Sequence, residues 1–152
     1  MLATAVSEYG QIAEWDVSQI IDMSSLFANK ATCNPDISKW NTGNVGTMAG
    51  MFFGATSFNG DLSMWDTGKV TDTVGMFNRA ISFNGDLSKW DTGAVNNMRY
   101  MFNQASSFNG DLSKWKTGKV TDMVGMFSGA NSFTNPNYCP TAPQGVYLVC
   151  PP

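Results

Sequence analysis

Apolar residues recur along the chain with a period of 25 residues, which the tryptophans mark most plainly. The five tryptophans are Trp15, Trp40, Trp65, Trp90 and Trp115, each 25 residues after the one before. A fixed period of about 20–50 residues is typical of solenoids, propellers and repeat arrays. A propeller blade needs four strands, and a unit of this length is too short for them. The pattern therefore predicts that each unit forms one coil of a solenoid.

Positions within a unit are numbered here from its tryptophan, and positions 9, 12, 13 and 16 are apolar. This is the i, i+3, i+4, i+7 spacing of one helix face, as in Met98, Met101, Phe102 and Ala105. Asn-Gly pairs after it mark a turn, and the following Asp-Leu-Ser-Lys-Trp segment is expected to be a brief strand. We therefore predict an α/β solenoid in which each coil is a short strand, a bend, a short helix and a turn.

Stacking would place equivalent residues in columns, and each coil would bury the apolar side chains of its neighbours. Cys33 stands where later units have phenylalanine, so we interpret it as a small buried apolar residue rather than a reactive thiol. The predicted organisation is a single domain with a partial N-terminal coil at 1–14, five repeats at 15–139 and an irregular C-terminal cap at 134–152. A disulfide between Cys139 and Cys150 would fit an extracellular setting, and two reduced cysteines are the alternative.

Composition excludes several functional classes. The net charge is −3 and there is no basic cluster, which argues against nucleic-acid binding. Histidine is absent, which removes the commonest general base, and the carboxylates recur as a repeat rather than as a unique pair. We therefore expect neither an enzyme nor a cofactor. No apolar run approaches the length of a membrane span, and no signal peptide is visible.

Three columns of polar residues are candidates for chemistry. Calcium binding is conceivable at the aspartate column, although each carboxylate closing its own turn is the simpler interpretation; its members are Asp36, Asp61, Asp86 and Asp111. The asparagine column is expected to bond to backbone groups. The threonine column could order water as an ice-binding surface, but it is single and lies beside glycines; its members are Thr42, Thr67, Thr92 and Thr117.

The positions at which the units differ are the candidates for recognition. Positions 10, 11 and 14 vary between units, whereas the apolar columns repeat. A repeating scaffold that varies on one face has the form of a binding surface, with neutral drift at solvated positions as the alternative. Phe53, Arg99 and Tyr100 are the predicted contact residues, because aromatic residues and arginine are enriched at binding hot spots.

The unit also resembles the BspA-like surface protein repeats, which are grouped with leucine-rich repeats. Met101-Phe102-x-x-Ala105 and Phe108-Asn109-Gly110-Asp111 carry the resemblance, which extends over residues 9–134. It implies a right-handed, leucine-rich-repeat-like solenoid and an extracellular or cell-surface protein with a role in adhesion, and it supplies no catalytic residues. We therefore expect a binding module for a protein or glycan. A self-associating subunit of a layer, fibre or sheath is the alternative, and ice binding is a minor one.

Overall fold

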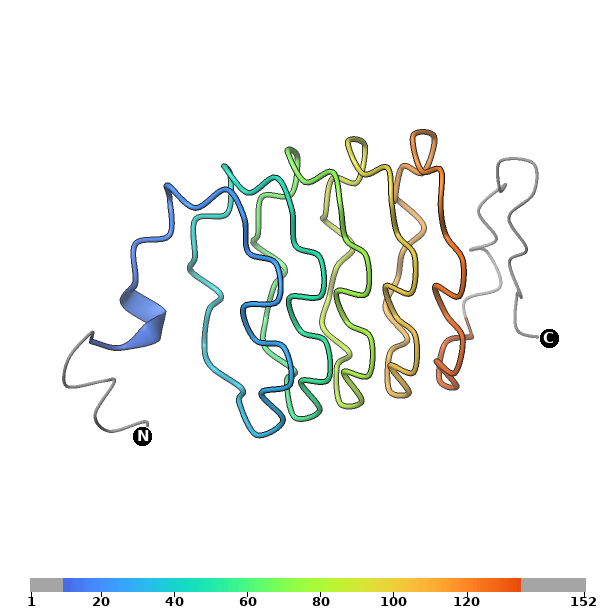
Figure 1. The fold of residues 1–152 in the computed structure, drawn as a ribbon, viewed down its shortest axis with the longest axis horizontal. Helices are drawn as coiled ribbons and strands as arrows, with labels where there is room; N and C mark the ends of the chain where they lie inside the picture. The colour runs from blue at the N-terminus through green and yellow to red at the C-terminus, as the bar shows by residue number, and fades with distance from the viewer. Residues whose placement is uncertain (1–9, 135–152) are drawn as a thin grey trace.

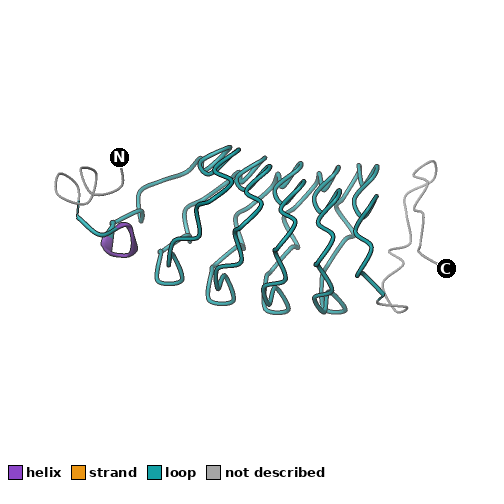
Figure 2. Cartoon of the chain, turned by 90° about the horizontal axis from the view of Figure 1, so that it is seen from below, coloured by secondary structure: helices purple, strands orange, loops and turns teal. Residues whose placement is uncertain are grey.

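The computed structural model describes residues 10–134, which form a stack of similar coils (Figure 1). We number the coils 1 to 5; they begin at Trp15, Trp40, Trp65, Trp90 and Trp115. Over the described residues, regular helix is confined to the short 3-10 helix η1 (Ile12–Glu14), near the N-terminal end (Figure 2). Parallel bridges join one residue of each coil to the next, in the order Asp22, Thr47, Asp72, Asn97 and Asp122. The coils themselves consist of turns and loops.

The predicted α/β fold, with a strand and a helix in each coil, is therefore wrong. Positions 9–16 form overlapping turns in which alternate N–H groups donate to the carbonyl three residues earlier. In coil 2 these donors are Met51, Phe53 and Ala55, at 3.1, 2.9 and 3.0 Å. The N–H groups between them donate instead to carbonyls of coil 3, at 2.7 to 3.0 Å; they belong to Met48, Gly50, Phe52 and Gly54. An α-helix would keep all these bonds within one segment, so bonding between coils replaces the helix.

Left-handed residues interrupt the same segment. Position 11 of every coil has a positive φ, from 54° at Tyr100 to 63° at Gly125. Position 15 does too, from 56° at Gln104 to 76° at Gly129. A left-handed residue cannot continue a right-handed helix, and two of them in each segment exclude one.

The expected strand is also a turn. In coil 2 the Trp65 N–H, at the start of the next coil, donates to the Leu62 carbonyl at 3.2 Å. The Ser63 N–H donates to Asp61 Oδ1 at 2.9 Å, and this bond to a side chain also closes the bend. Because both donors are used locally, this segment forms no ladder with its neighbours.

The predicted apolar columns do lie in the core. Phe27, Phe52, Phe77, Phe102 and Phe127 stack with ring centroids 5.4–5.6 Å apart. A second column, from Phe58 to Phe133, lies 3.9–4.1 Å from the first. The tryptophan rings stack from Trp40 onward. The indole Nε1–H groups of Trp65, Trp90 and Trp115 each donate to the carbonyl 28 residues earlier, which lies two coils back. Burial and aromatic stacking therefore act together along the whole stack.

Residues 10–14 belong to the predicted partial coil at 1–14. The Ile12 carbonyl accepts the Trp40 indole N–H at 2.9 Å, as the Ile37 carbonyl does for Trp65. Ile12 therefore occupies the place that Ile37 has in coil 1. The predicted cap at 134–152 lies outside the described residues, apart from Thr134.

Candidate binding surface

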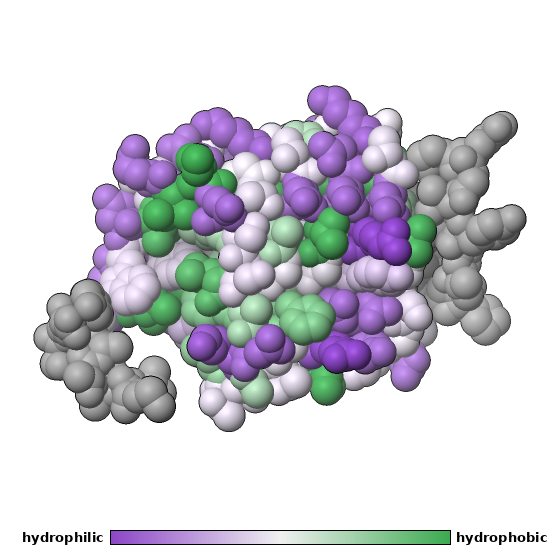
Figure 3. Space-filling view, in the orientation of Figure 1, coloured by the Kyte–Doolittle hydropathy of each residue, from purple (hydrophilic) through white to green (hydrophobic). Residues whose placement is uncertain are grey.

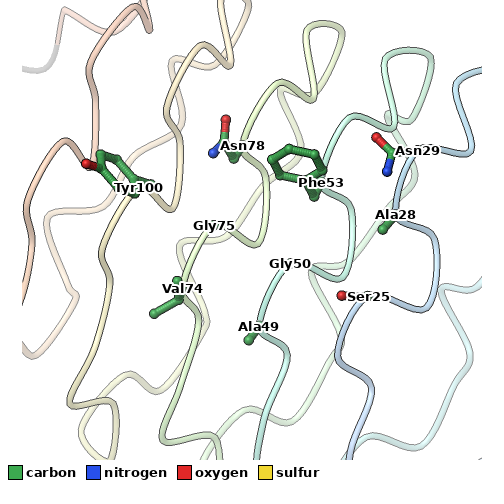
Figure 4. Close-up of a pocket in the computed structure, with 10 residues that line it drawn as sticks. All are labelled: Ser25, Ala28, Asn29, Ala49, Gly50, Phe53, Val74, Gly75, Asn78 and Tyr100. Carbon is green, nitrogen blue, oxygen red and sulfur yellow. The ribbon is translucent and has the colours of Figure 1, made fainter.

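The residues that vary between coils line an open groove across the stack (Figure 4). We call its ten lining residues the variable face; they are Ser25, Ala28, Asn29, Ala49, Gly50, Phe53, Val74, Gly75, Asn78 and Tyr100. The groove has a volume of about 470 Å³. Pale and apolar surface crosses the middle coils, with hydrophilic residues above and below it (Figure 3).

Small residues form the groove between two aromatic rings. Gly50 and Gly75 come from neighbouring coils at the same position, and Phe53 and Tyr100 stand on either side of Gly75 along the stack (Figure 4). The variable face includes no acidic or basic side chain. The two predicted aromatic contact residues thus belong to one surface, although 47 positions separate them in the sequence.

Arg99 lies beside Tyr100 rather than across the groove from it. Its guanidinium carbon lies 4.9 Å from the Tyr100 ring centroid, and Nη1 lies 3.3 Å from Asp122 Oδ2. The Tyr100 hydroxyl, and after it Asp122, raises the pKa of the Arg99 guanidinium. The structure therefore brings Arg99 and Tyr100 together as a cationic and aromatic pair at one end of the groove.

Gly125 makes room for the Tyr100 ring. A methyl group on Gly125 would overlap ring atoms of Tyr100 from the preceding coil. The same relation holds between Asn29 and Gly54 at position 15, where a Cβ would lie 2.7 Å from Asn29 Oδ1. At these two places a larger side chain is thus followed by glycine in the next coil.

The sequence prediction missed one residue beside the variable face, Arg79, and one residue within it, Asn78. Arg79 lies with its guanidinium carbon 6.0 Å from the Phe53 ring centroid. Asn78 lines the groove, and its Oδ1 is buried without a hydrogen-bond partner. Position 15 carries Asn29, Gly54, Arg79, Gln104 and Gly129, so its variation was the signal that could have found Arg79.

The aspartate column closes turns. Oδ1 of Asp36, Asp61, Asp86 and Asp111 accepts the N–H of the serine two residues later, at 2.9–3.1 Å. Hydrogen bonds from these serines lower the pKa of each carboxyl group. Among residues 10–134, no group of three or more acidic or cysteine side chains is placed to hold a metal ion.

The asparagine and threonine columns bond between coils. Oδ1 of Asn34, Asn59 and Asn84 accepts the N–H of the next asparagine in the column, at 2.8–2.9 Å. Thr42, Thr67 and Thr92 are buried, and each hydroxyl donates to a carbonyl of the following coil at 3.0 Å. These three hydroxyls therefore do not form an array that faces the solvent.

The repeat matches a known protein family. A family described as "Mycoplasma protein of unknown function, DUF285" matches residues 1–92 and 63–139. The chain belongs to this family. No curated protein and no solved structure matches it. The family description names no activity, so the function of this DUF285 chain has to be argued from its surface.

The cysteines of this DUF285 chain fall into two groups. Cys33 is a free thiol, half-buried against the core, and it lines a pocket of about 440 Å³ with Ile12 and Trp15. The predicted Cys139–Cys150 disulfide lies outside the described residues. No helix among the described residues is long and apolar enough to cross a membrane.

Proposed function

We propose that this chain is a non-enzymatic binding module, which contacts a protein or glycan through the variable face. One observation carries the proposal: the groove is built from the positions at which the coils differ. The columns that hold the stack together repeat almost unchanged, and they point inward. A repeated core with a varied, hollowed surface allows the surface residues to change without altering the residues that stabilise the stack.

The character of the groove supports this role. Phe53 and Tyr100 are aromatic residues at the surface, and each has an arginine beside it. Aromatic and arginine side chains contribute strongly at binding hot spots, and a groove of small residues allows a ligand to approach the backbone closely. We propose an extracellular or cell-surface location, which the resemblance to BspA-like surface repeats supports.

The repeat itself offers substitutions that test the surface without disturbing the coil. Tyr100→Gly installs the residue that Gly50, Gly75 and Gly125 already provide at this left-handed position. Phe53→Asn installs the residue present at the same position in coils 3 and 4. Met64→Lys is the matched control. Met64 is exposed outside the groove, at a position where coils 1, 3 and 4 carry lysine.

The wild-type chain is screened on a glycan array and on immobilised matrix proteins such as collagen. For any ligand found, we expect Tyr100→Gly and Phe53→Asn each to weaken binding at least about tenfold, as loss of a hot-spot side chain does. Met64→Lys should bind like wild type. Unchanged affinity in both groove variants would show that recognition lies elsewhere.

A further inference from the structure

The coils are joined by a fixed set of backbone hydrogen bonds. At every junction the N–H groups at positions 9, 11, 13 and 15 donate to carbonyls of the next coil at positions 8, 10, 12 and 14. Two N–H groups, at positions 7 and 18, donate in the opposite direction, for example from Thr71 to Gly46 and from Ser82 to Thr56. Each coil therefore has one side rich in carbonyl acceptors and one side rich in N–H donors.

Among residues 10–134, no coil lies against the acceptor-rich side of coil 1. We call this surface the leading edge; it comprises residues 20–28 and Thr32. No described residue donates to the carbonyl groups of its positions 8, 10, 12 and 14, which belong to Asp22, Ser24, Leu26 and Ala28. The N–H groups of Ile21 and Thr32 likewise have no acceptor among residues 10–134.

The leading edge is also apolar. Ile21 is 69% exposed and Leu26 is 46% exposed, whereas Met51, at the position of Leu26 in coil 2, is fully buried. Ile20 is 42% exposed, and its equivalent Val45 is fully buried. The terminal repeat of a solenoid ordinarily carries a polar outer face. This edge instead has the composition of an interface between coils.

We propose that the leading edge docks coil 5 of a second copy of this chain, as a continuation of the junctions within the stack. Coil 5 carries groups for four of the six bonds at the matching positions, namely the N–H groups of Met123, Gly125 and Gly129 and the Thr121 carbonyl. Docking would extend the hydrogen-bond pattern without changing its register, and it would cover Ile21 and Leu26.

Charge at position 2 favours the same arrangement. Lys116 of coil 5 lies 3.2 Å from Asp91, at the same position of coil 4. Coil 1 carries Asp16 at this position. In the docked pair, Lys116 would lie between the two carboxylates of Asp91 and the other copy's Asp16, as one cation shared across successive junctions.

The alternative, two leading edges facing each other, is disfavoured by the bonding groups. Carbonyl oxygens at positions 8, 10, 12 and 14 would then meet acceptors of the same kind, and unpaired buried polar groups are costly. The interface is consequently head to tail. A head-to-tail contact that does not close into a ring adds copies without limit.

Sedimentation velocity of the full chain tests the proposal over a range of concentrations. We expect the average mass to grow past that of a dimer as concentration rises, and Ile21→Lys to keep the chain monomeric. Ile81→Lys is the matched control, because Ile81 is exposed away from both ends of the stack; it should associate like wild type. Circular dichroism of both variants checks that the fold is intact.

A mixing experiment tests the direction of the contact. A chain with Ile21→Lys keeps its coil 5, so an excess of it should occupy wild-type leading edges and shorten the assemblies. With two leading edges facing each other, the variant would not bind and the assemblies would keep their size. Wild-type protein that stays monomeric at every concentration, or Ile21→Lys assemblies as large as wild type, would overturn the proposal. Neither result bears on the variable face, because none of its residues is changed.

Discussion

At the scale of single residues, the left-handed positions decide the local structure and the shape of the surface. Position 11 carries glycine in coils 2, 3 and 5 and a side chain in coils 1 and 4, yet φ is nearly the same throughout. The Tyr100 ring extends over Gly125 of the next coil. A glycine here therefore has two roles, a conformational one in every coil and a steric one only where the preceding side chain is large.

Two alanine substitutions separate these roles. Gly75→Ala places a methyl group 3.8 Å from Asn78 Cβ, which is ordinary contact, so we expect a loss of about 1–2 kcal/mol in the free energy of unfolding from left-handed strain alone. Gly125→Ala carries the same strain and also overlaps the Tyr100 ring. It should be the more destabilising of the two in urea denaturation.

Removing the ring provides the control. In a Tyr100→Gly background, Gly125→Ala should cost no more than Gly75→Ala does in the wild-type chain. An equal cost of the two alanines in the wild-type chain would show that the ring moves aside freely.

At the scale of the coil, sequence reasoning found the buried positions and assigned the wrong backbone. Met98, Met101, Phe102 and Ala105 are all buried, as a helix face would be. Overlapping turns bury residues at the same spacing as a helix does, because successive turns also bring residues three and four apart to one side. The signal against a helix was the glycine at Gly50, Gly75 and Gly125, which is unfavourable inside a helix. The bonds between coils that replace the helix join groups 24 residues apart, and no local pattern shows them.

Cys33 gives a prediction about the phenylalanine column. It occupies the place of Phe58, Phe83, Phe108 and Phe133, at the open end beside a pocket. In a Pro35→Gly background, Cys33→Phe should fill that pocket and stack on Phe58, as Phe58 stacks on Phe83 with centroids 6.0 Å apart. Glycine is needed at position 35 because a Cβ at the equivalent Gly60 would lie 3.0 Å from the Phe58 ring. We expect a gain of about 1 kcal/mol in the free energy of unfolding, since an aromatic pair contributes about 0.5–1.5 kcal/mol beyond burial.

Urea denaturation of Cys33→Phe and Cys33→Ala, both compared with Pro35→Gly alone, measures the effect. The alanine variant removes the thiol without filling the pocket, so it should not be stabilised. A loss of stability in the phenylalanine variant would mean that the pocket cannot accommodate the ring.

At the scale of the whole molecule, the variable face became visible only when the coils were stacked. Tyr100 and Phe53 were identified from differences between units, and the structure places them on one groove. Asn78 stands at position 14, which varies between units, but it was not predicted as a contact residue because that choice favoured aromatic residues and arginine. The aspartates also repeat from coil to coil, and their carboxylates respond together to pH.

The folded chain should lose stability in acid. The pKa values of Asp36, Asp61, Asp86 and Asp111 are lowered from 3.8 by hydrogen bonds from serine. The unfolded chain therefore binds these protons first. The contribution of each group is fully present above its unfolded pKa, and it is lost as pH falls through the lower, folded pKa. Melting temperatures measured from about pH 7 to about pH 2 should fall mainly below about pH 4.

Asp86→Asn supplies the control for this acid effect. The amide oxygen can still accept the Ser88 N–H, but it does not titrate. The variant should show a shallower loss in acid than wild type. An identical pH profile would assign the acid sensitivity to other groups.

The bonds between coils also give the stack an electrical direction. At each junction four backbone N–H groups point toward the C-terminal end and two point back. The peptide dipoles therefore do not cancel: partial negative charge gathers at coil 1, where carbonyls face outward, and partial positive charge gathers at the other end. An α-helix has the opposite sense, with its positive end at the N-terminus. This stack thus has a macrodipole of reversed polarity, and each added coil would lengthen it.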